Sequence, residues 1–382
     1  MATSRPGDSK TIVFDSRPIR HDRLKRLLER MIDIYSPSGK EEEILDYLHG
    51  YLKRHGLPVQ RQKVDEARYN LVVMPEGEVQ VSFVGHLDTV IAYDLDQFGY
   101  TEEGDLIAGL GAADMKGGCA AMIEAFIALW KRTPSPPPIA LALVVGEEEE
   151  GDGARILANT CQFNWAIIGE PTGLKPCLSH YGYLEIQLVA KGKRIHASLA
   201  NQCQNPIEAM LRMIVQFTHY IETNRSQLVY NIRDLFTTRA GFIVPDHCEA
   251  WLDVHMPPES PIGEIVAEIE ELFEQARANN PHFDGNLRFL TIDAGYELPE
   301  KGPLVEALKG IYVQRSLPWE PGPFRSHSDA NRLWASGVRP VLLGPGDLIH
   351  SHTPDESISF RQVAEAAEIY FALGHAMGED IQ

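Results

Sequence analysis

Apolar residues recur at helical spacing in the first part of the chain and then give way to short strand-like runs. Apolar residues on one helical face predict an amphipathic helix over residues 23–31. A second amphipathic helix is expected to begin after a cap at Ser38, with Ile44, Leu45, Leu48 and Leu52 as its buried face. Residues 79–84 form a strand-like run, and residues 139–145 are continuously apolar, which is typical of a strand buried on both faces. A helical run at residues 117–131 lies between them. This alternation predicts an α/β domain built on a mostly parallel sheet.

The periodicity changes near residue 181. From there the chain shows the order strand, helix, strand, strand, helix, strand, which is typical of a ferredoxin-like fold. The expected strands are residues 183–189, 241–244, 249–254 and 287–292, and the expected helices are residues 207–222 and 262–278. We therefore predict that residues 1–180 and 295–382 form one sheet domain and that residues 181–294 are an inserted domain.

Acidic and histidine residues occur where the strand-like runs of the sheet domain stop. In chain order they are His86 with Asp88, Asp114, the glutamate run 147–150, Glu170 and His352. Ligands of open α/β sheets gather at the carboxyl ends of the strands, so we expect these side chains to share one site. Two imidazoles and several carboxylates suit zinc or a similar divalent ion, and the set is large enough for two ions.

Each of these features also has a purely structural explanation. His86 and Asp88 face the same way on an extended segment, where the carboxylate can orient the ring, but a short His-x-Asp sequence is weak evidence by itself. Asp114 stands at the start of a helical run and could cap it. Four consecutive glutamates could form a solvated loop, although they repel one another directly after a buried strand. Their occurrence together and in this order favours a metal site.

The bulk composition excludes several classes of partner. The chain has 382 residues, 44% of them hydrophobic, and a formal net charge of −19, which argues against nucleic acid and anionic membranes. Five cysteines without a CxxC pair indicate reduced thiols rather than a disulfide framework. Residues 1–20 lack the apolar segment of a secretory signal, and the apolar stretch 117–130 is too short to span a membrane. We therefore expect a cytoplasmic protein.

At these residues the chain resembles the M20 family of metal-dependent amidohydrolases and peptidases, over roughly residues 23–378. That family includes acetylornithine deacetylases, succinyl-diaminopimelate desuccinylases, N-acetyl-lysine deacetylases and dipeptidases. The segments that carry the resemblance are His86-Leu87-Asp88-Thr89-Val90, Asp114-Met115-Lys116-Gly117, Glu148-Glu149, Gly169-Glu170-Pro171-Thr172, His196-Ala197-Ser198 and His352-Thr353-Pro354-Asp355-Glu356. The resemblance implies a dinuclear-metal hydrolase domain with an inserted lid that also serves dimerisation.

The resemblance implies a set of metal ligands. His86 and Glu170 look like terminal ligands of one ion, and Asp114 looks like the bridge between two ions. Glu149 and His352 look like ligands of the second ion. The expected cofactors are therefore two divalent metal ions, with zinc as the first expectation and cobalt or manganese as alternatives.

Further residues receive catalytic roles from the resemblance. Asp88 resembles the residue that orients His86, and Glu148 resembles the general base. His196, in the inserted domain, is similar to a histidine that reaches the site of a neighbouring subunit and steadies the oxyanion of the reaction. A homodimer is therefore the expected assembly.

Two positions depart from the family's pattern. The family usually has Asp-Glu-Glu where this chain has only glutamates, so the base and ligand could be Glu147 and Glu148 instead of Glu148 and Glu149. We prefer the second pair because Gly151 then follows it as in the family's pattern. The segment Asp253-Val254-His255 stands where relatives often carry Asp-x-Arg, which leaves the substrate specificity open.

The expected reaction is hydrolysis of the amide bond of an N-acylated amino acid of the acetylornithine, acetyl-lysine or succinyl-diaminopimelate type. Arg325 and Arg332 could pair with a substrate carboxylate or be ordinary surface arginines, and with Gly344 and Gly346 they resemble the family's substrate-binding surface. The expected partner is therefore a small acyl amino acid or a short peptide. A dipeptidase, aminopeptidase or carboxypeptidase of the same family is the alternative, and the full ligand set argues against a non-catalytic binding protein.

Overall fold

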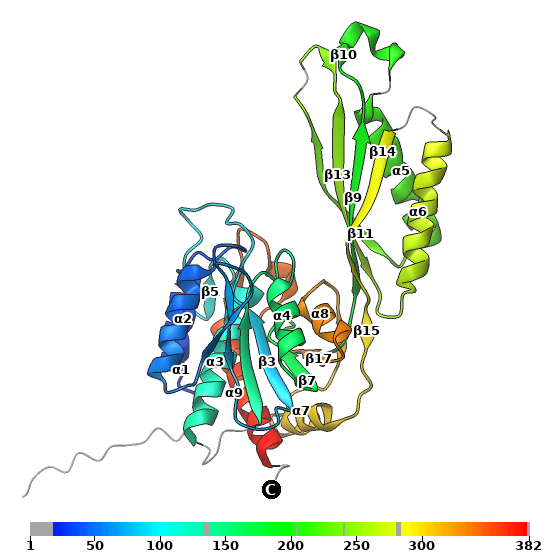
Figure 1. Cartoon of the computed structure of the whole chain (residues 1–382). Helices are drawn as coiled ribbons and strands as arrows, with labels where there is room; N and C mark the ends of the chain where they lie inside the picture. The colour runs from blue at the N-terminus through cyan, green and yellow to red at the C-terminus, as the bar shows by residue number, and fades with distance from the viewer. Residues whose placement is uncertain (1–17, 133–137, 204, 240, 280–283, 380–382) are drawn as a thin grey trace, which may run out of the picture.

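The chain forms two bodies that are joined by two extended connections (Figure 1). The structure is a computed structural model and describes residues 18–132, 138–203, 205–239, 241–279 and 284–379. A large body contains both the beginning and the end of the described chain, and a small body over residues 182–293 projects from it. The domain boundaries at residues 180 and 295 stay a prediction.

A nine-stranded sheet forms the centre of the large body. Its strands lie in the order β1 (Gln60–Lys63), β2 (Tyr69–Val73), β6 (Ile139–Val144), β3 (Val81–His86), β7 (Trp165–Ile168), β17 (Arg339–Leu342), β8 (Cys177–His180) and β15 (Tyr296–Glu297), with β16 (Gly322–Phe324) paired to β8. The neighbours β6, β3, β7 and β17 are parallel, and every residue of β6, β3 and β7 is buried. The expected α/β class with a mostly parallel central sheet is thus confirmed.

Helices cover this sheet because each presents an apolar face to it. One group packs together: α1 (His21–Ile32), α3 (Gly117–Arg132), α7 (Pro303–Gln314) and α9 (Phe360–Glu379). A second pair is α4 (Asp152–Thr160) with α8 (Asp329–Ala335), and α2 (Glu42–Arg54) contacts β2. A small sheet of β4 (Thr101–Glu103), β5 (Leu106–Ala108) and β18 (Ser357–Ser359) joins the last part of the chain to the first.

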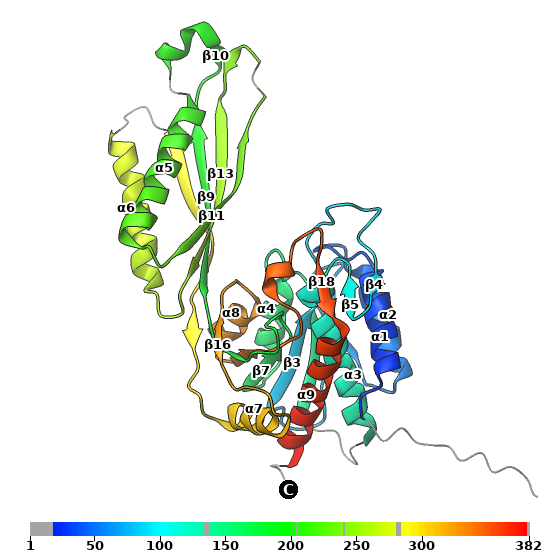
Figure 2. The same cartoon turned by 180° about the vertical axis from the view of Figure 1, so that it is seen from behind.

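The small body has a four-stranded antiparallel sheet with its own apolar core. Its strands lie in the order β11 (Val229–Thr237), β13 (His247–Met256), β9 (Gly182–Lys191) and β14 (Asp284–Asp293). Both α5 (Pro206–Asn224) and α6 (Ile262–Asn279) contribute to that core (Figures 1 and 2). Along the chain the order is strand, helix, strand, strand, helix, strand, as expected of a ferredoxin-like fold.

One strand of the small body differs from the expectation. The second strand was expected at residues 241–244, but the sheet uses β11, and only β12 (Ile243–Val244) forms in the expected place, paired with β10 (Ile195–His196). The reason is that β11 lies at the sheet edge and contains a register shift between Ile232 and Asp234. An edge strand with exposed apolar residues on both sides of a bulge does not show the alternation of a half-buried strand.

Two glycines allow the connections between the bodies to cross closely. Gly182 begins β9, and Gly295 follows the end of β14. A Cβ atom on Gly182 would lie 2.8 Å from the backbone nitrogen of Gly295, so a larger residue would push the two connections apart. The chain therefore enters and leaves the small body at one narrow point.

No helix in the described part of the chain is long and apolar enough to cross a membrane. Residues 1–17, which carry most of the argument against a secretory signal, lie outside the described residues. The described cysteines are all free, which agrees with the expectation of reduced thiols.

A glycine-to-alanine pair tests the packing beneath the strand ends. A Cβ atom on Gly118, in the first turn of α3, would collide with the carbonyl oxygen of Gly169, next to the end of β7. Gly118→Ala should therefore lower the free energy of unfolding by about 1–3 kcal/mol, measured by denaturant titration. The matched control is Gly310→Ala in α7, where nothing lies within 4 Å of the new Cβ atom. It should leave stability unchanged or raise it by up to about 1 kcal/mol, and equal losses in both variants would contradict the packing argument.

Candidate metal centre

Six side chains from different elements converge at one edge of the large sheet. Within each of three overlapping groups the donor atoms lie within 4.8 Å of one another. The groups are His86, Glu147 and Glu148; His86, Asp114 and Glu170; and Asp114, Glu148 and His352. These residues bring together two imidazoles and four carboxylates, the mixed donor set that zinc and related divalent ions accept.

Strand register explains why these residues meet. His86 is the last residue of β3 and pairs with Val144, the last residue of β6, so the glutamates after β6 lie just beyond it. Val84 pairs with Ile168 at the end of β7, which places Glu170 level with His86. Because β6, β3 and β7 are parallel, their carboxyl ends share one edge of the sheet.

The two remaining members come from loops. Asp114 lies in the short helical segment η1 (Ala112–Lys116), in front of α3, and His352 lies in the loop after the 3₁₀ helix η3 (Leu348–His350). One oxygen of Asp114 is 3.2 Å from Nε2 of His86, and the other is 3.5 Å from Nε2 of His352. Asp114 thus stands between the two imidazoles, as a carboxylate that bridges two ions would.

Burial makes the charges of this cluster costly. It raises the pKa of Glu147 and of Glu170 well above the usual range, and nearby carboxylates raise both further. For His86, burial lowers the pKa, but Glu147 and the other surrounding carboxylates outweigh it and raise the pKa well above its usual value. Oε1 of Glu170 is buried without a hydrogen-bond partner. A cluster with more carboxylates than imidazoles, and with a buried oxygen that accepts no hydrogen bond, fits bound cations.

Asp88 supports the glutamates as well as the histidine. Its carboxylate accepts the backbone N–H of Glu147 at 3.2 Å and of Glu148 at 3.0 Å, and it also accepts the hydroxyl of Ser38 at 2.6 Å. Nδ1 of His86 lies 3.0 Å from the backbone carbonyl of Asp88 and 3.7 Å from its carboxylate. Asp88 therefore lies behind His86 and fixes the first turn of the glutamate run.

The structure does not bring Glu149 into the cluster, although the preferred register made it a ligand. Its side chain is exposed and belongs to none of the three groups. Because Asp88 holds the two preceding amides, the chain turns away after Glu148, and the left-handed Gly151 then leads into α4. Glu148 joins the cluster instead, with Oε2 2.9 Å from Nε2 of His352. This geometry favours the other register, in which Glu147 and Glu148 are the functional pair.

His196 lies far from this cluster within the chain. It belongs to β10, at the end of the small body that points away from the large body in both views (Figures 1 and 2). Its ring is exposed, and Nδ1 is 2.8 Å from the hydroxyl of Ser198. One copy of the chain therefore does not bring His196 to the strand ends.

The four residues expected to bind substrate divide into two kinds. Arg325 is exposed, whereas Arg332 is already engaged, with Nη1 2.8 Å from Oδ1 of Asp293. Gly344 and Gly346 lie against the segment after β7: the backbone N–H of Leu174 donates to Gly344, and that of Gly173 donates to Gly346. A Cβ atom on Gly344 would lie 2.5 Å from the carbonyl oxygen of Glu170, so this glycine lets the loop approach a cluster residue.

Glu356 supports the cluster and was not assigned from the sequence. Its carboxylate accepts the backbone N–H groups of Gly111, Ala113 and Asp114 at 2.9, 2.9 and 3.0 Å. It therefore holds the loop that carries Asp114. The signal available in the sequence was its place four residues after His352, in the same motif.

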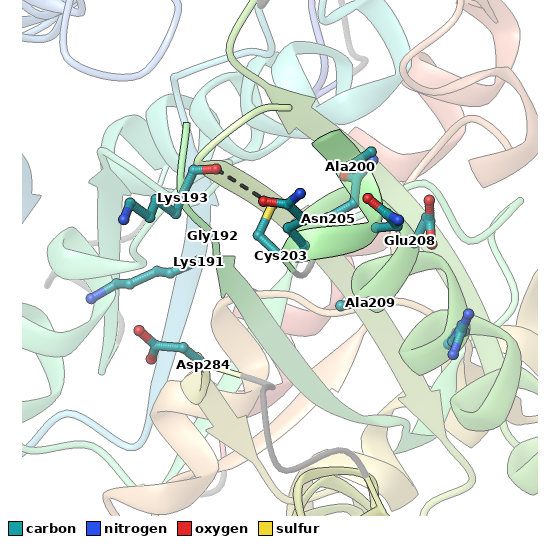
Figure 3. Close-up of a pocket in the computed structure, with 12 residues that line it drawn as sticks. Lys191, Gly192, Lys193, Ala200, Cys203, Asn205, Glu208, Ala209 and Asp284 are labelled. Carbon is teal, nitrogen blue, oxygen red and sulfur yellow. Dashed lines mark hydrogen bonds between the residues drawn. The ribbon is translucent and has the colours of Figure 1, made fainter. Parts of the chain in front are cut away.

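One cavity lies in the small body, away from the cluster. Figure 3 shows this cavity of about 500 Å³ near the start of α5, with Lys191, Lys193, Glu208 and Asp284 among its lining residues. None of its lining residues belongs to the cluster. The candidate site is therefore identified by its converging donors and not by cavity size.

Comparisons with known proteins identify the family of this chain. A family model described as peptidase family M20/M25/M40 matches residues 82–375. The acetylornithine deacetylase of Edwardsiella ictaluri is 30% identical over 344 residues, which cover 83% of this chain and 86% of that protein.

Solved structures share the fold over almost the whole chain. A tripeptidase of Staphylococcus aureus has a TM-score of 0.78 at 19% identity, with coverage of 94% of this chain and 100% of that chain. A Bacillus subtilis protein, described as a dinuclear metal binding peptidase from the M20 family, has a TM-score of 0.67 at 13% identity, with coverage of 94% and 98%. At these identities the two structures show the fold alone.

Replacement of Glu356 tests the support of the Asp114 loop. Burial raises the pKa of Glu356 to about 7, against the lowering effect of its backbone hydrogen bonds, so the measurement belongs at a pH above that value. Glu356→Gln turns an amide N–H₂ towards buried N–H donors and should lower the free energy of unfolding by about 2 kcal/mol. Asp355→Asn, at the exposed neighbouring position, should change it by less than about 0.5 kcal/mol. Equal unfolding midpoints for the two variants would contradict this role.

Proposed function

This chain belongs to peptidase family M20/M25/M40, and on that premise we propose that it hydrolyses the amide bond of an N-acylated amino acid. The products would be a carboxylate and a free amine. The observation that carries the proposal is the convergence of six donor side chains at the carboxyl ends of β3, β6 and β7. The similarity to an acetylornithine deacetylase supports an acylated amino acid as substrate. The acyl group, acetyl or succinyl, is left open.

The donor groups divide naturally between two divalent ions, for which zinc is our first choice and cobalt or manganese the alternatives. His86 and Glu170 would hold one ion, Glu148 and His352 the other, and Asp114 would bridge them. This division uses two of the three donor groups and leaves Glu147 free. When bound, the ions supply Lewis acidity, which polarises the amide carbonyl and makes a water molecule more acidic.

Glu147 is the proposed general base. It is buried at the edge of the cluster, with Oε2 3.8 Å from Nε2 of His86, and it is not needed for either ligand set. In this role its carboxylate takes a proton from the attacking water and delivers it to the leaving amine. Asp88 serves as a positioning residue, because it holds the backbone of Glu147 and Glu148 and lies behind His86.

A second copy of the chain would complete the site. His196 is exposed at the far end of the small body, and β11 is an edge strand with exposed apolar side chains. These side chains are Val229, Ile232, Leu235 and Phe236. An unpaired apolar edge invites pairing with another chain, and a two-fold dimer would apply the same surface of both copies. We infer that this homodimer places His196 of one subunit near the oxyanion in the site of the other.

The proposal also includes a substrate-binding arginine and a cellular compartment for the reaction. Arg325 is exposed and able to pair with a substrate carboxylate, whereas Arg332 is committed to Asp293. We place the reaction in the cytoplasm, because the free cysteines suit a reducing compartment.

Three adjacent glutamine variants test the register and the reaction together. Glu147→Gln should keep its metal content and lose turnover by at least about 100-fold, because only the base is removed. Glu148→Gln should lose bound metal, and Glu149→Gln should change neither quantity. Metal content by elemental analysis and amine release from N-acetyl and N-succinyl amino acids and dipeptides give the readout. Metal loss in Glu149→Gln would restore the register preferred from sequence, and release from dipeptides alone would identify a peptidase.

A mixing experiment tests the dimer. Subunits with His196→Ala and subunits with Glu147→Gln should each be nearly inactive alone. Co-refolded in equal amounts, they should recover about a quarter of wild-type activity, because half of the dimers are mixed and each mixed dimer has one complete site. A mixture of His86→Ala with Glu147→Gln is the control and should recover nothing, since both residues belong to one site. Failure of the first mixture to recover activity would contradict sharing of the site.

A further inference from the structure

The base of the small body presents a tyrosine and a carboxylate side by side to the large body. Tyr183 and Asp293 are paired residues on the neighbouring strands β9 and β14, at the point where the chain enters and leaves the small body. Asp293 is buried, with 6% of its surface exposed. Any rotation of the small body about its two connections must move these side chains relative to the large body.

His327 of the large body contacts both of them. Its Nε2 lies 3.1 Å from Oδ2 of Asp293, and its ring centroid lies 4.9 Å from that of Tyr183. The other oxygen of Asp293 accepts from Nη1 of Arg332 at 2.8 Å, so the carboxylate is held by two large-body side chains. The imidazole thus lies directly at the junction between the two bodies.

The second ring nitrogen of His327 faces the candidate base. Nδ1 lies 4.0 Å from Oε1 of Glu147, which is an ion-pair distance rather than a hydrogen bond. Glu147 has His86 on its other side, with 3.8 Å between Nε2 and Oε2. His327 is therefore the side chain through which the small body can reach the carboxylate of Glu147.

From this geometry we propose that His327 is a positioning residue that links the orientation of the small body to the carboxylate of the general base, which rests on the assignment of Glu147 in the proposed function. Asp293 carries the imidazole as the small body rotates, and the imidazole sets the direction in which the carboxylate of Glu147 points. A hinge of two short connections closes by small changes at a few residues, so one side chain at the hinge can report closure to the site. The linkage predicts that turnover requires both ring nitrogens.

Two amides separate the functions of the two nitrogens. His327→Asn keeps a nitrogen near the position of Nδ1, facing Glu147, and loses the contact with Asp293. His327→Gln keeps a nitrogen near the position of Nε2, facing Asp293, and loses the contact with Glu147. If His327 links the two groups, both variants should lower kcat on the order of tenfold or more with KM changed less than about threefold, because the base is misplaced after substrate has bound.

Asp293→Asn tests the linkage from the other end. The carboxylate of Asp293 lies in the small body, and its replacement should lower kcat to a similar extent. The double variant with His327→Gln should have a kcat no lower than that of the poorer single variant. Glu249→Gln is the control: Glu249 is a carboxylate of β13 in the same sheet and accepts from Gln187 and Trp251, without a contact to His327 among the described residues. It should leave kcat within about twofold of wild type.

The outcomes separate this inference from the proposed function. Wild-type protein that releases no amine from any substrate, in the assay with Glu147→Gln alongside, would remove the proposed function and the inference with it. An active wild type with full kcat in His327→Asn would show that the Asp293 contact is dispensable, and full kcat in His327→Gln would show the same for the Glu147 contact. Either result would overturn the linkage, as would additive losses in the double variant with Asp293→Asn.

Discussion

The candidate site in the large body depends on one electrostatic constraint: several carboxylates are held close together at a buried edge of the sheet, although their charges repel one another. Parallel pairing of β6, β3 and β7 brings Glu147, Glu148 and Glu170 to the same level, and Asp114 joins them from the loop before α3. Removal of an ionised carboxylate from water costs several kcal/mol, and neighbouring carboxylates add repulsion. Two imidazoles compensate only part of this charge. Bound cations would compensate the remainder, so the same feature that destabilises the empty cluster would favour the binding of divalent ions.

Backbone hydrogen bonds hold this unfavourable cluster in place. Asp88 accepts the amides of Glu147 and Glu148, and Glu356 accepts three amides of the loop that carries Asp114. In both cases a buried carboxylate outside the ligand set is satisfied by N–H donors, so it adds no unpaired charge. Glu147, Glu148 and Asp114 are thus held through their own backbone N–H groups, and their side chains stay available. The glycines at positions 118 and 344 also help to hold the cluster in place, because they let α3 and the loop after β17 reach the ends of the strands.

The sequence predicted what depends on local periodicity and order. Buried strands such as residues 139–145 and amphipathic helices follow from their own side chains, and the order of strand ends was sufficient to bring His86, Asp114, Glu170 and His352 to one site. Which of Glu148 and Glu149 lies in the cluster was not predictable, because it depends on which amides Asp88 holds, and that contact spans about 60 residues. The strand β11 was missed for a related reason. The location of this strand depends on its position at the sheet edge and on its bulge, which are properties of the sheet and not of the segment itself.

The small body has different requirements at its two ends. Its far end carries His196, which one chain leaves exposed and distant from the cluster, so the role proposed for that histidine needs another copy. Its near end carries Tyr183 and Asp293 against His327, so that end determines how the body is oriented. A rigid four-stranded sheet between the two ends transmits any rotation at the joint over the full length of the body. In the proposed homodimer, a small change beside Glu147 in one subunit would correspond to a large displacement of His196 of the same subunit, which serves the site of the other subunit. The base of one site and the oxyanion donor of the other would then be mechanically linked across the dimer.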